Sequence, residues 1–328
     1  MQKPNIKRSL VHTISRYSNW SAESINEFLR AKRIYADVHN WRDFIRLLLV
    51  GGGVAFLVSG IIFFFAYNWE DMHKFTKLGL VQGILTLMVL ASVFLKIDVR
   101  IKNILLTGAA MLVGALFSVF GQIYQTGADA YDLFLGWTLF IALWVFVSNF
   151  PPLWFIFLGL VNLTIGLYAE QVATDWSEYQ VANILFLVNV VSLLFLKWQE
   201  GSVFVEKVPK WLERTIVIVS VGYITMSFCV GIFENKSPMS WYISILLSLL
   251  TYGVGLWYGR KEKDTFYIAV VGLSMIMAST AFLIDVLKDF LKLQSLLLIG
   301  GYIVGSVSFL VTQIIYLNKK WHGEADVK

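Results

Sequence analysis

Charged residues are scarce in this chain. Only 15% of its 328 residues are Asp, Glu, Lys or Arg, whereas 57% are apolar. Soluble domains usually carry about 25% charged residues, so this composition argues against an ordinary water-soluble fold and indicates lipid as the solvent. The single cysteine, Cys229, excludes an intrachain disulfide, and its apolar neighbours favour a small buried hydrophobe.

Sequence signatures of catalysis are also missing. The four histidines lie outside the apolar runs and are not spaced as metal ligands: His12, His39, His73 and His322. There is no HExxH, CxxC, GxSxG, Walker A or GxGxxG pattern. We therefore assign no catalytic residue, no metal site and no cofactor, and an enzyme is the less favoured class.

Long apolar runs dominate what is present. A transmembrane helix needs roughly 20 mostly apolar residues. Ten such runs occur, and none contains Asp, Glu, Lys or Arg: 47–67, 78–95, 104–122, 133–149, 152–169, 181–196, 215–233, 239–258, 266–284 and 296–317. The predicted fold is all-α, a polytopic membrane helix bundle with about ten transmembrane helices.

The fourth and fifth runs are separated by Asn149-Phe150-Pro151-Pro152 alone. Because the two prolines cannot continue the preceding helix, we expect a tight turn there.

Positive charge is distributed unevenly among the connections. With the N-terminus inside, the inner segments hold 22 of the 27 Lys and Arg residues and the outer segments hold five. This bias is what the positive-inside rule predicts. We expect a multi-pass protein of a bacterial inner (cytoplasmic) membrane, with both the N-terminus and the C-terminus cytoplasmic.

The sequence divides into three parts on this reading. Residues 1–46 form a small N-terminal cytoplasmic helical module, residues 47–317 the transmembrane bundle, and residues 318–328 a cytoplasmic tail. A stretch around residues 35–46 is expected to run into the first span. The net charge of +5 does not indicate nucleic acid, because the basic residues are scattered among short loops. The expected partner is the lipid bilayer.

Within the module, Ser21 is expected to begin a helix that carries Ile25, Phe28 and Leu29 on one face. A short basic amphipathic helix beside a membrane favours a position on anionic lipid.

Small and neutral polar residues inside the runs indicate how the helices pack. Small residues let backbones approach in lipid, so we expect the following residues to pack inside the bundle: Gly51, Gly52, Gly53, Gly60, Gly108, Ala109, Ala110, Gly114 and the GxxxG pairs Gly255–Gly259 and Gly301–Gly305. The neutral polar residues Gln82, Asn162, Asn183, Asn189 and Gln313 are expected to bridge helices.

One outer connection is unusually polar. Residues 121–137 carry two Gln, two Asp and two Tyr but no cation. We expect Gly127 to make the turn and Asp129 or Asp132 to cap the next helix. Gln122 ends its run, where an amide facing lipid would be costly, so it is expected to face the bundle.

A second polar patch ends the first run on the same side. We predict that the two patches form an outward-facing ligand-binding pocket with these members: Asn68, Trp69, Glu70, Gln122, Tyr124, Gln125, Asp129 and Asp132. Its carboxylates favour a cationic or hydroxyl-rich ligand, or a metal bound weakly through water. The alternative is a hydrogen-bonded lock that pins the loop.

These residues also carry a resemblance to a known family. The N-terminal helical module, the end of the first span at Ala66-Tyr67-Asn68-Trp69-Glu70 and the stretch Gly121–Trp137 resemble the DUF2157 family of bacterial membrane proteins. The resemblance covers about the first 150 residues. It implies a bacterial membrane protein and no activity, because the family is defined as a domain of unknown function.

Three functions fit this architecture. The first is a transporter or permease for a small solute. Against it, the runs hold no ionisable residue, whereas proton-coupled carriers usually keep one near the middle of the membrane. The second is a non-transporting envelope protein that scaffolds, senses or regulates through a membrane protein partner. The third is a membrane-embedded enzyme that acts on a lipid-linked substrate through outer carboxylates.

Overall fold

The fold is known from a computed structural model, which describes residues 19–31, 38–68, 73–124, 127, 129–200, 208–233, 238–288 and 293–322. Eleven helices lie within these ranges: α2 (Ala22–Ala31), α3 (Val38–Asn68), α4 (Lys74–Phe94), α5 (Val99–Tyr124), α6 (Ala130–Ser148), α7 (Pro151–Gln171), α8 (Glu178–Trp198), α9 (Lys210–Phe233), α10 (Pro238–Lys261), α11 (Thr265–Leu287) and α12 (Leu293–His322).

Ten of these helices, α3 to α12, are long and apolar enough to cross a membrane. Many of their largest side chains face outward, as Phe63, Leu143 and Leu249 do with 73%, 69% and 65% of their surface exposed. Such exposure would be unfavourable in water but suits a helix surrounded by lipid. The predicted all-α bundle with ten spans is therefore confirmed.

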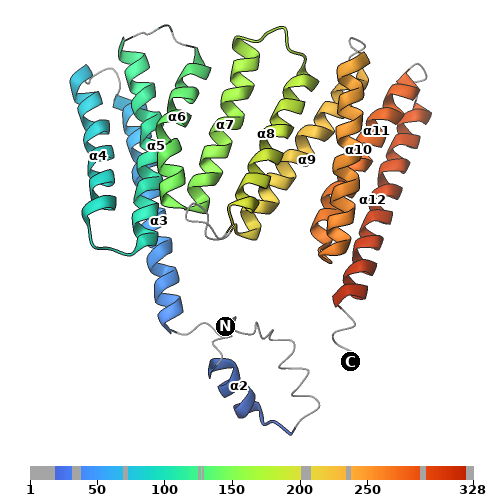
Figure 1. Cartoon of the computed structure of the whole chain (residues 1–328), viewed down its shortest axis with the longest axis horizontal. Coiled ribbons are helices and arrows are strands. Elements are labelled where there is room, and N and C mark those ends of the chain that lie inside the picture. The colour runs from blue at the N-terminus through green and yellow to red at the C-terminus, as the bar shows by residue number, and fades with distance from the viewer. Residues whose placement is uncertain are drawn as a thin grey trace.

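The helices stand side by side in a long row that begins with α4 and α3 and finishes with α12 (Figure 1). In the first part of the row, α5 packs against α3, α4 and α6, and α6 packs against α7. In the second part, α9 packs against α8, α10 and α11, and α11 also packs against α12. The contact between α7 and α8 is less extensive than those of α6 with α7 and of α8 with α9.

Both ends of the row of spans lie on one side, because ten crossings return the chain to where it started. We call this side, where α3 begins and α12 ends, the terminal end, and the other side the opposite end (Figure 1). Residues 95–98, 149–150, 199–200, 208–209 and 262–264 connect or flank helices at the terminal end.

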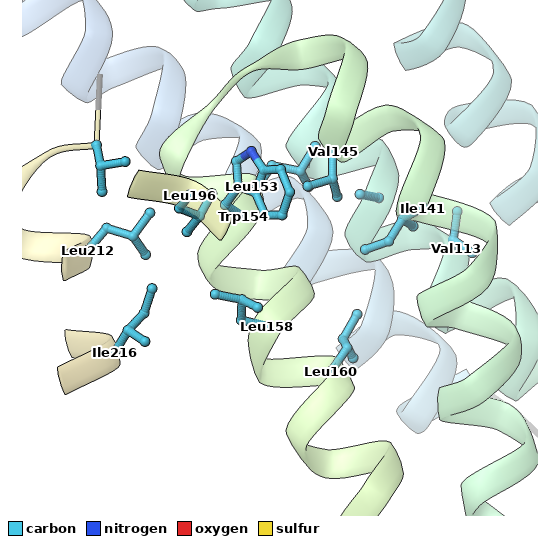
Figure 2. Packing of buried hydrophobic residues seen from close by; sticks show 12 residues of the cluster. Val113, Ile141, Val145, Leu153, Trp154, Leu158, Leu160, Leu196, Leu212 and Ile216 are labelled. Atoms are coloured by element: carbon cyan, nitrogen blue, oxygen red, sulfur yellow. The ribbon is translucent and has the colours of Figure 1, made fainter. Parts of the chain in front are cut away.

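One hydrophobic cluster ties the two parts of the row together. Leu153, Trp154 and Leu158 on α7 belong to the same buried cluster as Leu196 on α8 and Leu212 and Ile216 on α9. Figure 2 shows these side chains gathered between the helices. The two parts of the row are therefore in contact through α7, α8 and α9 near the terminal end.

Several predicted helix ends are confirmed. The Ser24 N–H donates to Ser21 Oγ (3.2 Å), so Ser21 starts α2. The α6–α7 turn is made by Asn149 in the left-handed region (φ 49°), and Pro151 and Pro152 open α7, where a proline needs no hydrogen-bonded N–H. Helix α3 starts at Val38, so the stretch before the first apolar run does continue into it.

The glycine predictions are confirmed in some helices and wrong in others. A Cβ at Gly108, Gly114, Gly255 or Gly259 would meet neighbouring side chains within 3 Å, so these glycines mark close helix contacts. By contrast, a Cβ on any of the glycines at 51–53, 60, 301 and 305 would meet nothing within 4 Å. The prediction for these positions fails because α3 and α12 lie near the edges of the row, where the glycines face open space.

Candidate functional site

In the outer loop predicted to form a pocket, the described residues make a turn and the start of α6. Gly127 has a positive φ of 63°, which glycine adopts without strain, and so makes the expected turn. Asp129 is the N-cap of α6, and its N–H donates to the Asp132 carboxylate at 3.2 Å. The predicted capping of α6 is thereby confirmed.

The same loop is attached to α7. The Tyr131 N–H donates to Gln171 Oε1 (2.9 Å), and the Tyr131 ring packs edge-on against Tyr168. Asp129 and Asp132 therefore lie beside the last turn of α7.

Gln122 is exposed at the end of α5, whereas we expected it to face the bundle. That expectation is wrong because the last helical turn is close enough to the membrane surface for water and lipid headgroups to satisfy the amide. Tyr124 is also exposed, and its ring packs against Phe120. The remaining members of the predicted pocket, Trp69, Glu70, Gln125 and the Asn68 side chain, lie outside the described residues.

A pair of amides lies at the middle of two adjacent spans. Asn162 is midway along α7 and Asn189 midway along α8. The Asn189 amide donates to Asn162 Oδ1 at 2.6 Å, and the Asn162 amide donates back to Asn189 Oδ1 at 3.3 Å. Each amide also donates to the carbonyl four residues earlier on its own helix, so all four N–H groups are used.

This pair opens onto a groove of about 600 Å³, which we call the amide groove. It is lined by α7, α8 and α9, and its polar members are Asn162, Asn189, Thr215, Tyr223 and Glu170. The size is that of a small-molecule site. Mostly apolar walls with a few placed hydrogen-bonding groups are also typical of such sites.

A second amide is buried among three helices. Asn183 on α8 donates to Ser244 on α10 and accepts from Ser227 on α9, both at 2.8 Å. Ser227 and Ser244 are completely buried, so this network joins three helices and offers nothing to a ligand. The prediction that Asn162, Asn183 and Asn189 bridge helices is confirmed.

The most strongly connected charged group lies at the terminal end. Glu213 on α9 is only 8% exposed. Its Oε2 is 2.7 Å from Lys197 Nζ on α8, and its Oε1 accepts from the Tyr267 hydroxyl of α11 at 2.7 Å. We call Lys197, Glu213 and Tyr267 the Glu213 cluster. A buried carboxylate is costly unless its oxygens are paired in this way.

A second ion pair adjoins the Glu213 cluster. Arg214 donates to Asp264 Oδ2 at 2.8 Å and stacks over the Phe266 ring. Partial burial opposes ionisation of Asp264, but the hydrogen bonds from Arg214 and the Phe266 N–H hold its pKa below the usual value.

Sequence reasoning missed the Glu213 cluster because it began the seventh span at residue 215. Helix α9 starts five residues earlier, which places Glu213 inside the helix. Two signals were available. Lys197 and Glu213 flank the same connection, so they lie at one membrane depth, and Glu213 shares a helix face with Ile216 and Ser220.

Across the described ranges, no three His, Cys, Asp or Glu side chains are grouped so that they could hold a metal ion.

The fold and its polar groups define a polytopic membrane protein built only of helices in the described part of the chain. Residues 18–154 match the DUF2157 family, described as a predicted membrane protein, which confirms the resemblance. The match extends from α2 to the start of α7, so all residues of the amide groove and of the Glu213 cluster lie beyond it. Neither curated proteins nor solved structures give a match.

Proposed function

We propose that the protein is a permease for a small, uncharged, hydrogen-bonding solute, and that the amide groove is its binding site. The observation that carries this proposal is the position of Asn162 and Asn189, which line the groove at mid-span. Polar groups at that depth are unfavourable in lipid unless they are partnered, and in transport proteins they mark solute paths.

The charge distribution favours an uncharged solute and passive transport. In the described spans, Asp, Glu, Lys and Arg occur only near the helix ends. Carriers driven by protons or ions usually keep an ionisable residue near the membrane centre. A groove with amide and hydroxyl groups at that depth suits a solute such as a polyol or a small amide.

The polar outer residues form the mouth of this path in our proposal. Glu170 lines the amide groove near the end of α7. The hydrogen bond from Tyr131 to Gln171 keeps Asp129 and Asp132 beside that helix end. The eight residues predicted as a pocket would then gather the solute before it enters the groove.

The test compares two glycine variants in vesicles. Neither Gly166 on α7 nor Gly222 on α9 has an atom within 4 Å of an added Cβ, but only Gly166 lines the groove. Purified protein is reconstituted, and vesicle swelling is followed by light scattering after mixing with glycerol or urea. We expect the native protein to raise permeability, Gly166→Phe to abolish the increase, and Gly222→Phe to preserve it.

Equal swelling of protein-containing and protein-free vesicles across a panel of small neutral solutes would contradict the permease. Full activity of Gly166→Phe would show that the solute does not pass through the amide groove.

The orientation belongs to the same proposal. We infer that the terminal end faces the cytoplasm of a bacterial inner membrane, because the connections at that end carry most of the Lys and Arg residues. Reporter fusions after Lys102 and Lys261 are expected to read inside, and a fusion after Asp175 is expected to read outside. The reverse pattern would invert the assignment.

A further inference from the structure

A second groove lies on the other side of α8. It has a volume of about 640 Å³ and is lined by α8, α9, α10 and α11. We call it the apolar groove, because aliphatic side chains such as Leu194, Leu250 and Val254 make up most of its wall. Lys197, Glu213, Tyr258 and Tyr267 line it at the terminal end.

The length of the apolar groove matches one lipid chain. Its wall on α8 extends from Phe186 to Lys197, which spans about 16 Å at the helical rise of about 1.5 Å per residue. One leaflet contributes half of a hydrocarbon core that is about 30 Å thick. An acyl chain lying in the groove would therefore place its headgroup at the Glu213 cluster.

Two side chains at the polar end of the groove, Lys197 and Tyr258, have N–H or O–H groups available to a ligand. An ammonium group has three N–H donors. Lys197 uses one on Glu213, while Glu200 lies at 3.7 Å, which is an ion pair but too long for a hydrogen bond. Tyr258 lines the same end of the groove as Lys197, and its hydroxyl has no hydrogen-bond partner among the described residues. Lys197 and Tyr258 can therefore both donate to a phosphate.

The charges at the polar end of the apolar groove favour a headgroup that carries an amine as well as a phosphate. Lys197 carries one positive charge against the two negative charges of Glu200 and Glu213, and the neighbouring Arg214–Asp264 pair is balanced. Lys210, near Asp264, and Glu262, near Tyr258, add one charge of each sign and leave this balance unchanged. A headgroup with phosphate alone would add negative charge beside two carboxylates. A primary amine next to the phosphate would offset that charge and donate hydrogen bonds to Glu200, which a quaternary ammonium cannot do.

We propose that the apolar groove binds one acyl chain of a phospholipid whose headgroup carries both a phosphate and a primary amine. The phosphate accepts hydrogen bonds from Lys197 and Tyr258, and the amine pairs with Glu200. This lipid site is separate from the amide groove, since the two grooves open on different sides of α8. It stands whether or not the protein transports a solute.

The test uses native mass spectrometry of the full chain in detergent, mixed with equal amounts of three lipids. These lipids share their acyl chains and differ only in an ethanolamine, glycerol or choline headgroup. We expect one retained lipid per chain, with the ethanolamine form preferred by about fivefold, as for one exposed charged contact. Equal retention of all three would overturn the headgroup assignment.

Matched variants locate the lipid. Leu194 and Val191 are both exposed on α8, but only Leu194 lines the apolar groove. Leu194→Trp and Leu250→Trp are expected to abolish retention, whereas Val191→Trp is expected to keep it. Retention in both groove variants would place the lipid elsewhere on the protein.

Glu200→Gln tests the amine contact without touching the buried carboxylate. We expect this variant to keep one bound lipid and to lose the preference for ethanolamine over choline. An unchanged preference in Glu200→Gln would overturn the proposed pairing. A melting temperature equal to that of the native protein shows that each variant is folded.

Discussion

The polar residues of the α5–α6 loop and those of the Glu213 cluster contrast in how they are held. In the loop, Asp129 and Asp132 are exposed and bond mainly within their own helix start. In the cluster, Glu213 is buried and bonds to residues 16 and 54 positions away, on α8 and α11. The polar residues of the loop can be recognised from the sequence, whereas the Glu213 cluster can be recognised only from the structure.

The contrast shows that density of polar residues and structural connection are different properties. A short loop between two spans can gather polar side chains because water and headgroups solvate them there. A carboxylate inside a helix bundle persists only with partners on neighbouring helices. A buried carboxylate with partners therefore indicates more about how the spans pack together than an exposed polar loop does.

The largest expected effect comes from breaking the Glu213 cluster. Lys197→Met should lower the free energy of unfolding by about 2–3 kcal/mol, because it leaves a buried carboxylate with only Tyr267 as partner. Asp132→Asn, in the exposed cap, should cost less than about 1 kcal/mol. Both are measured by denaturant unfolding in detergent.

A double variant sharpens this result. Lys197→Met combined with Glu213→Gln should recover most of the lost stability, because no unpaired charge is left in the bundle. Equal losses of unfolding free energy in Lys197→Met and Asp132→Asn would show that the buried cluster contributes no more to stability than the exposed loop.

The glycines give the next largest difference. A Cβ at Gly255 would lie 2.6 Å from Val271 on α11, so Gly255→Leu should cost about 2 kcal/mol through overpacking. Gly301→Leu and Gly305→Leu should change the melting temperature very little, because both positions face open space. A marked loss in the α12 variants would point to a contact that forms only between protein copies.

Buried amides are expected to have a smaller effect. Asn183→Leu removes hydrogen bonds to Ser227 and Ser244 and should cost about 1 kcal/mol, the usual size for polar contacts between membrane helices. Gln82 is exposed on α4, so Gln82→Leu serves as the control and should be neutral. Similar unfolding curves for the two variants would assign Asn183 no structural role.

The number of spans could be predicted from sequence alone, because each span needs a long run of apolar residues and the runs were uninterrupted. The cap at Asp129 and the turn at Asn149 could be predicted too, since they depend on residues within a few positions of each other. The start of α9 was predicted too late in the chain, because a helix can continue past charged residues when they find partners.

The candidate sites could not be derived in the same way. The pairing of Asn162 with Asn189 depends on α7 and α8 meeting at mid-span, and that of Glu213 with Tyr267 depends on α9 packing against α11. Apolar runs do not specify which helices become neighbours, because most faces of a membrane helix are apolar whether they contact lipid or protein.

The smallest expected effect concerns acid stability and again separates the two parts of the molecule. Asp98, before α5, and Asp264, before α11, both have a pKa below the usual value. Asp98 owes this to the backbone N–H and then the side chain of Arg100, two residues away. Such a local contact can persist in the unfolded chain, so it adds little to folding stability.

Asp264 is held instead by Arg214 from a different helix, a contact that exists only in the folded protein. Because folding lowers its pKa, the stabilisation is complete above about pH 4 and is lost as the pH falls through the folded-state value. Asp264→Asn should therefore flatten the dependence of melting temperature on pH below about pH 4, and Asp98→Asn should leave it nearly unchanged. If Asp98→Asn flattened the curve as much as Asp264→Asn, local hydrogen bonds would contribute to acid sensitivity as much as the Arg214–Asp264 pair between α9 and the start of α11 does.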